Sequence, residues 1–121
     1  MVLLNFALVQ YYTKQLSSIS MFIYNITIKF EWAIGAAYMK WMQEKHIPDI
    51  MNTGYFEKYQ FVKLLDIDEE EGPTYALQLY AADRANYETY IQQHAPALRE
   101  ESKQLWGDRC MTFRTLMEVV N

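Results

Sequence analysis

The chain has 121 residues, the usual size of one domain, and 51% of them are hydrophobic, which excludes an intrinsically disordered protein. The formal net charge is -4 and no cluster of Lys and Arg is present, so the sequence lacks the electrostatic footprint of most nucleic-acid-binding proteins. We expect one folded domain that binds neither DNA nor RNA.

The first twenty residues need separate treatment. Their apolar run is too short for a membrane span, and it lacks the basic start of a signal peptide. Met21 stands directly before the first clear strand pattern. We therefore expect residues 1–20 to be an N-terminal extension or a start-site artefact, residues 21–121 to form the domain, and no association with a membrane.

The first half of the domain predicts a strand followed by helices. Apolar and polar residues alternate over residues 22–30, which is typical of a strand with one apolar face. Helical spacing then covers roughly residues 33–45. Because Pro48 disfavours helical geometry in the residue before it, the helix should end near His46, with a short helix starting at Pro48 and closed by Gly54.

The middle of the chain predicts a hairpin. Residues 55–65 and 74–81 are rich in aromatic and branched side chains, and the acidic, glycine-containing residues 66–73 separate them. The acidic residues lack the ligand spacing and the sixth-position glycine of an EF-hand loop. We expect a solvated hairpin tip and no metal site.

The last third predicts a divided helix and a final strand. Asp83 can cap a helix, Pro96 can begin a further helical segment, and Gly107 can end it. Residues 110–120 alternate as a strand does. Cys110 is the single cysteine, so no intrachain disulfide or cysteine-based zinc site is expected, which favours a reducing, cytoplasmic environment and an inert thiol.

This order of elements predicts an α+β fold of the ferredoxin-like βαββαβ type. Two right-handed crossovers around a hairpin place both helical layers on one face of a four-stranded antiparallel sheet. The side chains assigned to the other face are more apolar than a solvated face requires. They are Val62, Leu64, Ala76, Tyr80 and Leu116. We therefore expect a homodimer that pairs through this open sheet face into an eight-stranded closed arrangement.

Five segments also carry a resemblance to a known family. They are IYNIT at 23–27, WMQEKHIPDIMNTGYF at 41–56, TYALQLY at 74–80, HAPAL at 94–98 and FRTLMEVV at 113–120. In this order and spacing the chain resembles domain of unknown function 4286, a family of short, uncharacterised bacterial proteins. The resemblance implies a dimeric α/β barrel, a superfamily that includes monooxygenases, haem-degrading enzymes, isomerases and proteins without known activity. It implies no particular reaction.

His46 is the candidate catalytic residue. It follows an amphipathic helix, and an imidazole titrates near neutral pH as a general base must; it can also ligate haem. In this interpretation His46 faces a cavity between helix and sheet. The alternative is that His46 ends the helix and its imidazole binds a local backbone group at the carbonyl end of the dipole.

Polar residues of the strands form the candidate ligand-binding set, because convergent polar groups in an apolar cavity are typical of small-ligand sites. The set is Asn25, Thr27, Gln60, Gln78, Arg114 and Glu118. The alternative is that Arg114 and Glu118 pair with neighbouring strands or across the dimer and only determine register.

Two functions remain open from the sequence. The first is a dimeric small-ligand-binding or regulatory module. The second is a small cofactor-independent enzyme of monooxygenase or isomerase type, with His46 as base and Arg114 or Asn25 holding a substrate oxygen. Neither function requires a cofactor, and we expect none.

Overall fold

The strands and helices follow the predicted order. The structure is a computed structural model that describes residue 5, residues 7–9 and residues 21–121. Its elements are β1 (Phe22–Phe30), α2 (Gly35–Trp41), a π-helical turn (Met42–His46), α3 (Ile47–Asn52), β2 (Lys58–Lys63), β3 (Thr74–Ala81), α4 (Arg84–Gln93), α5 (Ala95–Trp106) and β4 (Cys110–Glu118). Short 3-10 turns at Trp32–Ile34 and Gly107–Arg109 connect the strands to the helices.

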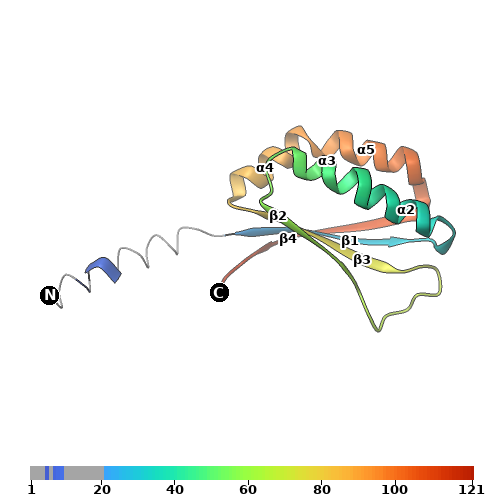
Figure 1. Cartoon of the computed structure of the whole chain (residues 1–121), viewed down its shortest axis with the longest axis horizontal. Coiled ribbons are helices and arrows are strands. Elements are labelled where there is room, and N and C mark those ends of the chain that lie inside the picture. Colours follow the sequence, from blue (N-terminus) through green and yellow to red (C-terminus); the bar gives the residue numbers. More distant parts are fainter. Residues whose placement is uncertain (1–4, 6, 10–20) are drawn as a thin grey trace.

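The four strands form one antiparallel sheet in the order β2-β3-β1-β4. The two helical pairs, α2–α3 and α4–α5, together cover one face of this sheet (Figure 1). This arrangement confirms the predicted ferredoxin-like fold. It also leaves the other face without a helical cover.

The alternation of β1 determines which side chains point to the helices. Tyr24, Ile26, Ile28 and Phe30 are buried in the core with helical side chains such as Tyr38. The odd-numbered residues of β1 therefore point to the open face, because successive side chains on a strand alternate. Residues that are directly paired on neighbouring strands share a face, so the register of β1 assigns the faces of β3 and β4.

The first helix does not end at His46, and this part of the prediction was wrong. The backbone N–H of Ile47 donates to the carbonyl oxygen of Met42, five residues back, and the helical path continues into α3. A normal helical turn would bring the Pro48 ring against the carbonyl of Glu44, four residues earlier. The wider π turn removes that clash, so the helix passes the proline instead of breaking.

The second helical layer is divided as predicted. The carboxylate of Asp83 accepts a hydrogen bond from the backbone N–H of Asn86 at 2.7 Å and caps α4. Pro96 stands at the start of α5, and Gly107 ends it with a positive φ of 54°. Only glycine adopts this backbone conformation without strain.

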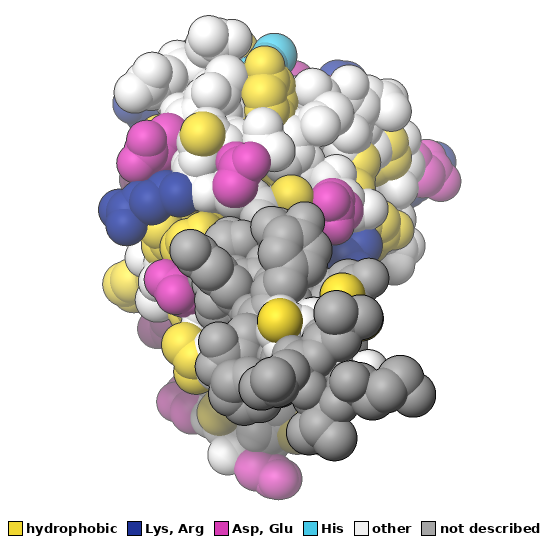
Figure 2. All heavy atoms as spheres, turned by 90° about the vertical axis from the view of Figure 1, so that its left-hand side faces the viewer, with side chains coloured by type: hydrophobic (Ala, Val, Ile, Leu, Met, Phe, Trp, Pro, Cys, Tyr) yellow, Lys and Arg dark blue, Asp and Glu magenta, His cyan; other side chains and the backbone are white. Residues whose placement is uncertain are grey.

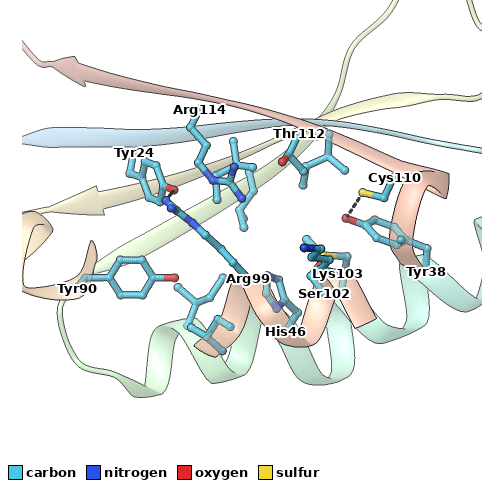
Figure 3. Close-up of a pocket in the computed structure, with 17 residues that line it drawn as sticks. Tyr24, Tyr38, His46, Tyr90, Arg99, Ser102, Lys103, Cys110, Thr112 and Arg114 are labelled. Atoms are coloured by element: carbon cyan, nitrogen blue, oxygen red, sulfur yellow. Dashed lines mark hydrogen bonds between the residues drawn. The ribbon is translucent and has the colours of Figure 1, made fainter. Parts of the chain in front are cut away.

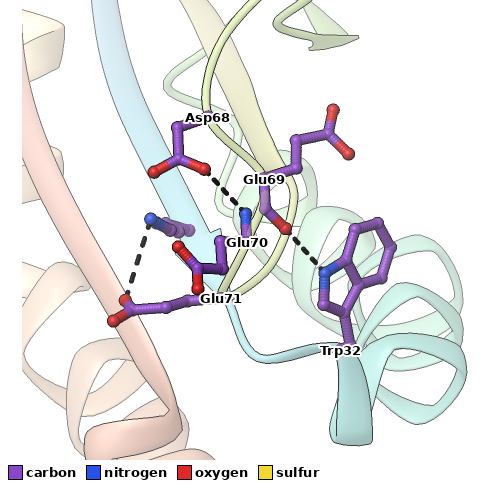
Figure 4. Close-up of polar contacts among 6 residues, drawn as sticks. Trp32, Asp68, Glu69, Glu70 and Glu71 are labelled. Atoms are coloured by element: carbon purple, nitrogen blue, oxygen red, sulfur yellow. Dashed lines mark hydrogen bonds and ion pairs between the residues drawn. The ribbon is translucent and has the colours of Figure 1, made fainter.

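The β2–β3 hairpin ends in an acidic loop that folds back toward α2. The indole Nε1–H of Trp32 donates to the carbonyl oxygen of Glu69 at 2.8 Å, and the backbone N–H of Glu70 donates to the Asp68 carboxylate at 2.9 Å (Figure 4). Trp32 is 54% exposed. It therefore anchors the loop from the surface and is not part of the core.

Residues 1–20 lie mostly outside the described residues. The expectation that they form an extension, with the domain at 21–121, stays a prediction. Within the part of the chain that the structure describes, no helix has the length and apolar character needed to cross a membrane.

Candidate functional site

A pocket of about 220 Å³ lies between the helices and the sheet. Its floor is apolar and comes from β1 and β3, with Ile26, Ile28 and Leu77. Its walls come from α2, the π turn and α3 on one side and from α5 and β4 on the other (Figure 3). The pocket therefore combines side chains that are far apart in the sequence.

His46 lines this pocket from the end of the π turn. Its ring stacks on Trp41 with 4.3 Å between centroids. Burial lowers the pKa of His46 to about 4, and the nearby carboxylates of Glu101 and Asp49 offset only part of this effect. The imidazole is therefore neutral at pH 7.

The Nδ1 atom of His46 is buried and has no hydrogen-bond partner among the described residues. The same holds for the indole nitrogens of Trp41 and Trp106. The two indole rings pack edge to face, with 5.7 Å between their centroids. Buried polar atoms of this kind are normally satisfied by ordered water. Because Nδ1 is out of contact with solvent, only the other ring atoms of His46 face the pocket.

Three basic side chains also line the pocket, those of Arg99, Lys103 and Arg114. The guanidinium of Arg99 donates to the hydroxyl of Tyr24 at 2.8 Å, which holds this side chain over the sheet. Arg114 points into the same space from β4, where it is paired with Ile26 of β1 (Figure 3).

Figure 2 views the end of the molecule that lies on the left of Figure 1, and there acidic and basic side chains are dispersed among apolar and uncharged ones.

Two phenols and a thiol complete the polar lining. Tyr90 reaches the pocket from α4, and burial raises its pKa. At the other end the thiol of Cys110 donates to the hydroxyl of Tyr38 at 3.4 Å. Burial raises the pKa of the Cys110 thiol as well, so the reactive thiolate is disfavoured.

The six strand residues of the candidate set do not share one space, and this prediction was wrong. Four of them, Asn25, Thr27, Gln60 and Gln78, lie on the open face of the sheet. Arg114 and Glu118 lie on the helical face, and only Arg114 lines the pocket. Leu116, which was also expected on the open face, is paired with the buried Tyr24 and points to the helices.

The open face carries its own pattern. Gln60, Gln78 and Asn25 are direct neighbours on β2, β3 and β1, so three amides form a row across the sheet. The amide of Asn25 donates to the hydroxyl of Thr27 at 3.1 Å. Asn25 and His46 are therefore on opposite faces, so of the two partners that the enzyme hypothesis offered for His46, Asn25 is excluded and Arg114 is retained.

Sequence reasoning missed several pocket residues. Arg99 and Lys103 are four residues apart on α5 and therefore share a helical face. This spacing could have indicated from the sequence that the two cations lie together. Tyr24 and Tyr90 are both buried. Their position at the edge of a pocket depends on how the helices sit on the sheet, which the sequence does not state.

The comparisons with known proteins agree with this fold. A family model for a domain of unknown function, DUF4286, matches residues 21–120. The chain belongs to the DUF4286 family. This confirms the resemblance found in the five sequence segments. No curated protein matches this DUF4286 chain.

Solved structures share the fold of this DUF4286 chain at low sequence identity. An ethyl tert-butyl ether D (EthD) family protein from Bacillus halodurans has a TM-score of 0.62 and 10% identity, with 81% of this chain and 99% of that chain covered. HapK from Hahella chejuensis has a TM-score of 0.58 and 13% identity, with 84% and 93% covered.

A third similar structure, from an uncultured marine organism, is described as a dimeric ferredoxin-like protein. Its TM-score is 0.53 at 16% identity, with 84% of this chain and 97% of that chain covered. At these identities the similarity shows the fold and not the activity.

Proposed function

We propose that this DUF4286 chain is a small-ligand-binding protein whose ligand lies in the pocket between the helices and the sheet. The observation that carries this proposal is the lining itself: an apolar floor with polar groups that converge from β1, α5 and β4. Small-molecule sites typically have this composition. The volume of about 220 Å³ is room for a compact organic molecule.

Binding is better supported than catalysis. His46 is the only candidate base that the sequence offered, and a pKa of about 4 makes its imidazole a weak base at neutral pH. Of its two proposed partners, Asn25 lies on the other face of the sheet, and only Arg114 shares the pocket with His46. The pocket therefore supports recognition of a ligand more directly than proton abstraction.

Filling the pocket should abolish ligand binding. Ser102 lines the pocket from α5, whereas Gln104, two residues later, is exposed on the same helix. We expect Ser102→Trp to occupy the pocket and Gln104→Trp to leave it open. In a thermal-shift screen of small metabolites, a compound present at about 100 times its Kd stabilises the wild type by about 2.7 kcal/mol.

That stabilisation should persist in Gln104→Trp and vanish in Ser102→Trp. Native mass spectrometry should likewise show a copurified molecule on the wild type and on Gln104→Trp, and none on Ser102→Trp. Compounds that stabilise all three proteins equally, or a screen without any stabilising compound, would contradict the proposal.

A homodimer through the open sheet face is the second part of the proposal. Met111 and Phe113 of β4 point to this face and are 58% and 62% exposed. Val62 of β2, which is half-buried, lies on the same face. Exposed apolar surface of this kind is typical of an interface, and one similar structure is described as dimeric. A cytoplasmic location belongs to the same proposal.

A charge in this surface should prevent pairing. We expect the wild type to sediment as a dimer at micromolar concentration and Phe113→Glu to sediment as a monomer, because a buried unpaired carboxylate is costly. Gln104→Glu adds the same charge to the exposed side of α5 and should remain dimeric. A monomeric wild type would end this part of the proposal.

A further inference from the structure

Three cationic side chains converge on the pocket from two elements. Arg99 and Lys103 come from α5 and Arg114 comes from β4. Among the residues that the structure describes, no Asp or Glu lines the pocket, and none of the three cations takes part in an ion pair. An acidic chain of net charge -4 thus gathers uncompensated positive charge at one place.

The contacts of the described residues do not explain why these three cations lie together. Arg99 and Lys103 repel each other, because like charges four residues apart destabilise a helix. Arg99 is held by a neutral partner, the hydroxyl of Tyr24 at 2.8 Å. The two carboxylates on α5 are engaged elsewhere: Glu101 pairs with Lys45 at 3.2 Å, and Glu100 accepts a hydrogen bond from the Gln104 amide at 3.3 Å. An anion from outside the chain would relieve the repulsion.

Resting on the proposed function, we infer that the ligand is an organic anion with one anionic head group and an apolar body. The head group, a carboxylate or a phosphate, binds among Arg99, Lys103 and Arg114. Guanidinium groups suit both head groups, because their N–H donors match two oxygens at once. The body lies on the apolar floor around Ile26 and Leu77.

Three phenyl compounds test this inference by calorimetric titration: benzoate, phenyl phosphate and the neutral benzamide. We expect at least one of the two anions to bind the wild type more tightly than benzamide does. Arg114→Gln should weaken binding of that anion roughly tenfold, a modest loss for a charge-assisted contact because Arg114 is exposed and solvent screens its charge. It should leave benzamide binding unchanged.

Arg84→Gln is the matched control, because Arg84 is exposed on α4 and pairs with Glu88 outside the pocket. It should bind the anion as the wild type does. A preference for benzoate or for phenyl phosphate would identify the head group, and either preference supports the inference.

Benzamide binding as tight as that of both anions, no binding of either anion at millimolar concentration, or an Arg114→Gln protein with unchanged anion affinity would overturn the inference. Failure of the proposed function looks different. In that case Ser102→Trp would bind the phenyl compounds as well as the wild type does.

Discussion

Replacing Gly72 by Ala should lower the free energy of unfolding by about 3 kcal/mol, the upper part of the range for overpacking. A Cβ atom at this position would lie 1.7 Å from the carbonyl oxygen of Phe30 and 2.8 Å from its carbonyl carbon. Both atoms belong to the backbone of β1, so a rotamer change cannot relieve the contact. The chain would have to separate where the hairpin loop meets the end of β1.

The surrounding hydrogen bonds make that separation costly. The backbone N–H of Phe30 donates to the carbonyl of Pro73 at 3.4 Å, and the N–H of Trp32 donates to the carbonyl of Glu71 at 3.4 Å. These two bonds enclose Gly72. A shift of the loop would weaken both of them and disturb the anchor between Trp32 and Glu69.

Gly35→Ala is the matched control for this prediction. A Cβ at Gly35 would meet only the Phe30 side chain, at an ordinary 3.8 Å, and the residue is helical. Alanine should therefore be neutral there or stabilise by up to about 1 kcal/mol. Urea unfolding of the two variants measures the contrast. Equal stabilities would show that the close approach of Gly72 to β1 is not rigid.

Acid should destabilise the protein through His46. The folded protein binds a proton on this imidazole only near pH 4, whereas the unfolded chain binds it near the ordinary value of 6.5. Between these values the unfolded state holds more protons, so a falling pH favours unfolding. The contribution of the neutral His46 to the free energy of unfolding amounts to about 3 kcal/mol. It is complete above pH 6.5 and is lost as the pH falls from 6.5 through 4.

His46→Gln removes the titrating group and should therefore remove this part of the pH dependence. We expect the variant to be less stable than the wild type at pH 7, because the stack on Trp41 is altered. Between pH 7 and pH 4, the free energy of unfolding of the wild type should fall by about 3 kcal/mol more than that of His46→Gln. Urea unfolding at both pH values measures it.

Gln104→Ala removes an exposed side chain that does not titrate and should follow the wild type at both pH values. Parallel curves for the wild type and His46→Gln would contradict the assigned role of His46.

The sequence by itself determined the order of elements, the helical caps and the family. Local chemistry was sufficient for these features. Alternation over β1, the Asp83 cap and the Gly107 terminus each depend on residues that are close in the chain. The path of the helix past Pro48 was harder, because a proline can either end a helix or widen it by one residue. Only the hydrogen bond from Ile47 to Met42 distinguishes the two outcomes.

The tertiary structure alone decided which polar residues meet. Both faces of β4 carry apolar side chains, such as Phe113 on one face and Leu116 on the other, so alternation could not tell which face points to the helices. The pairing of Ile26 with Arg114 decided it and brought Arg114 to the same pocket as His46 and Arg99. Strand register and the placement of α5 on the sheet are long-range properties, which is why the pocket and its positive charge emerge only from the folded chain.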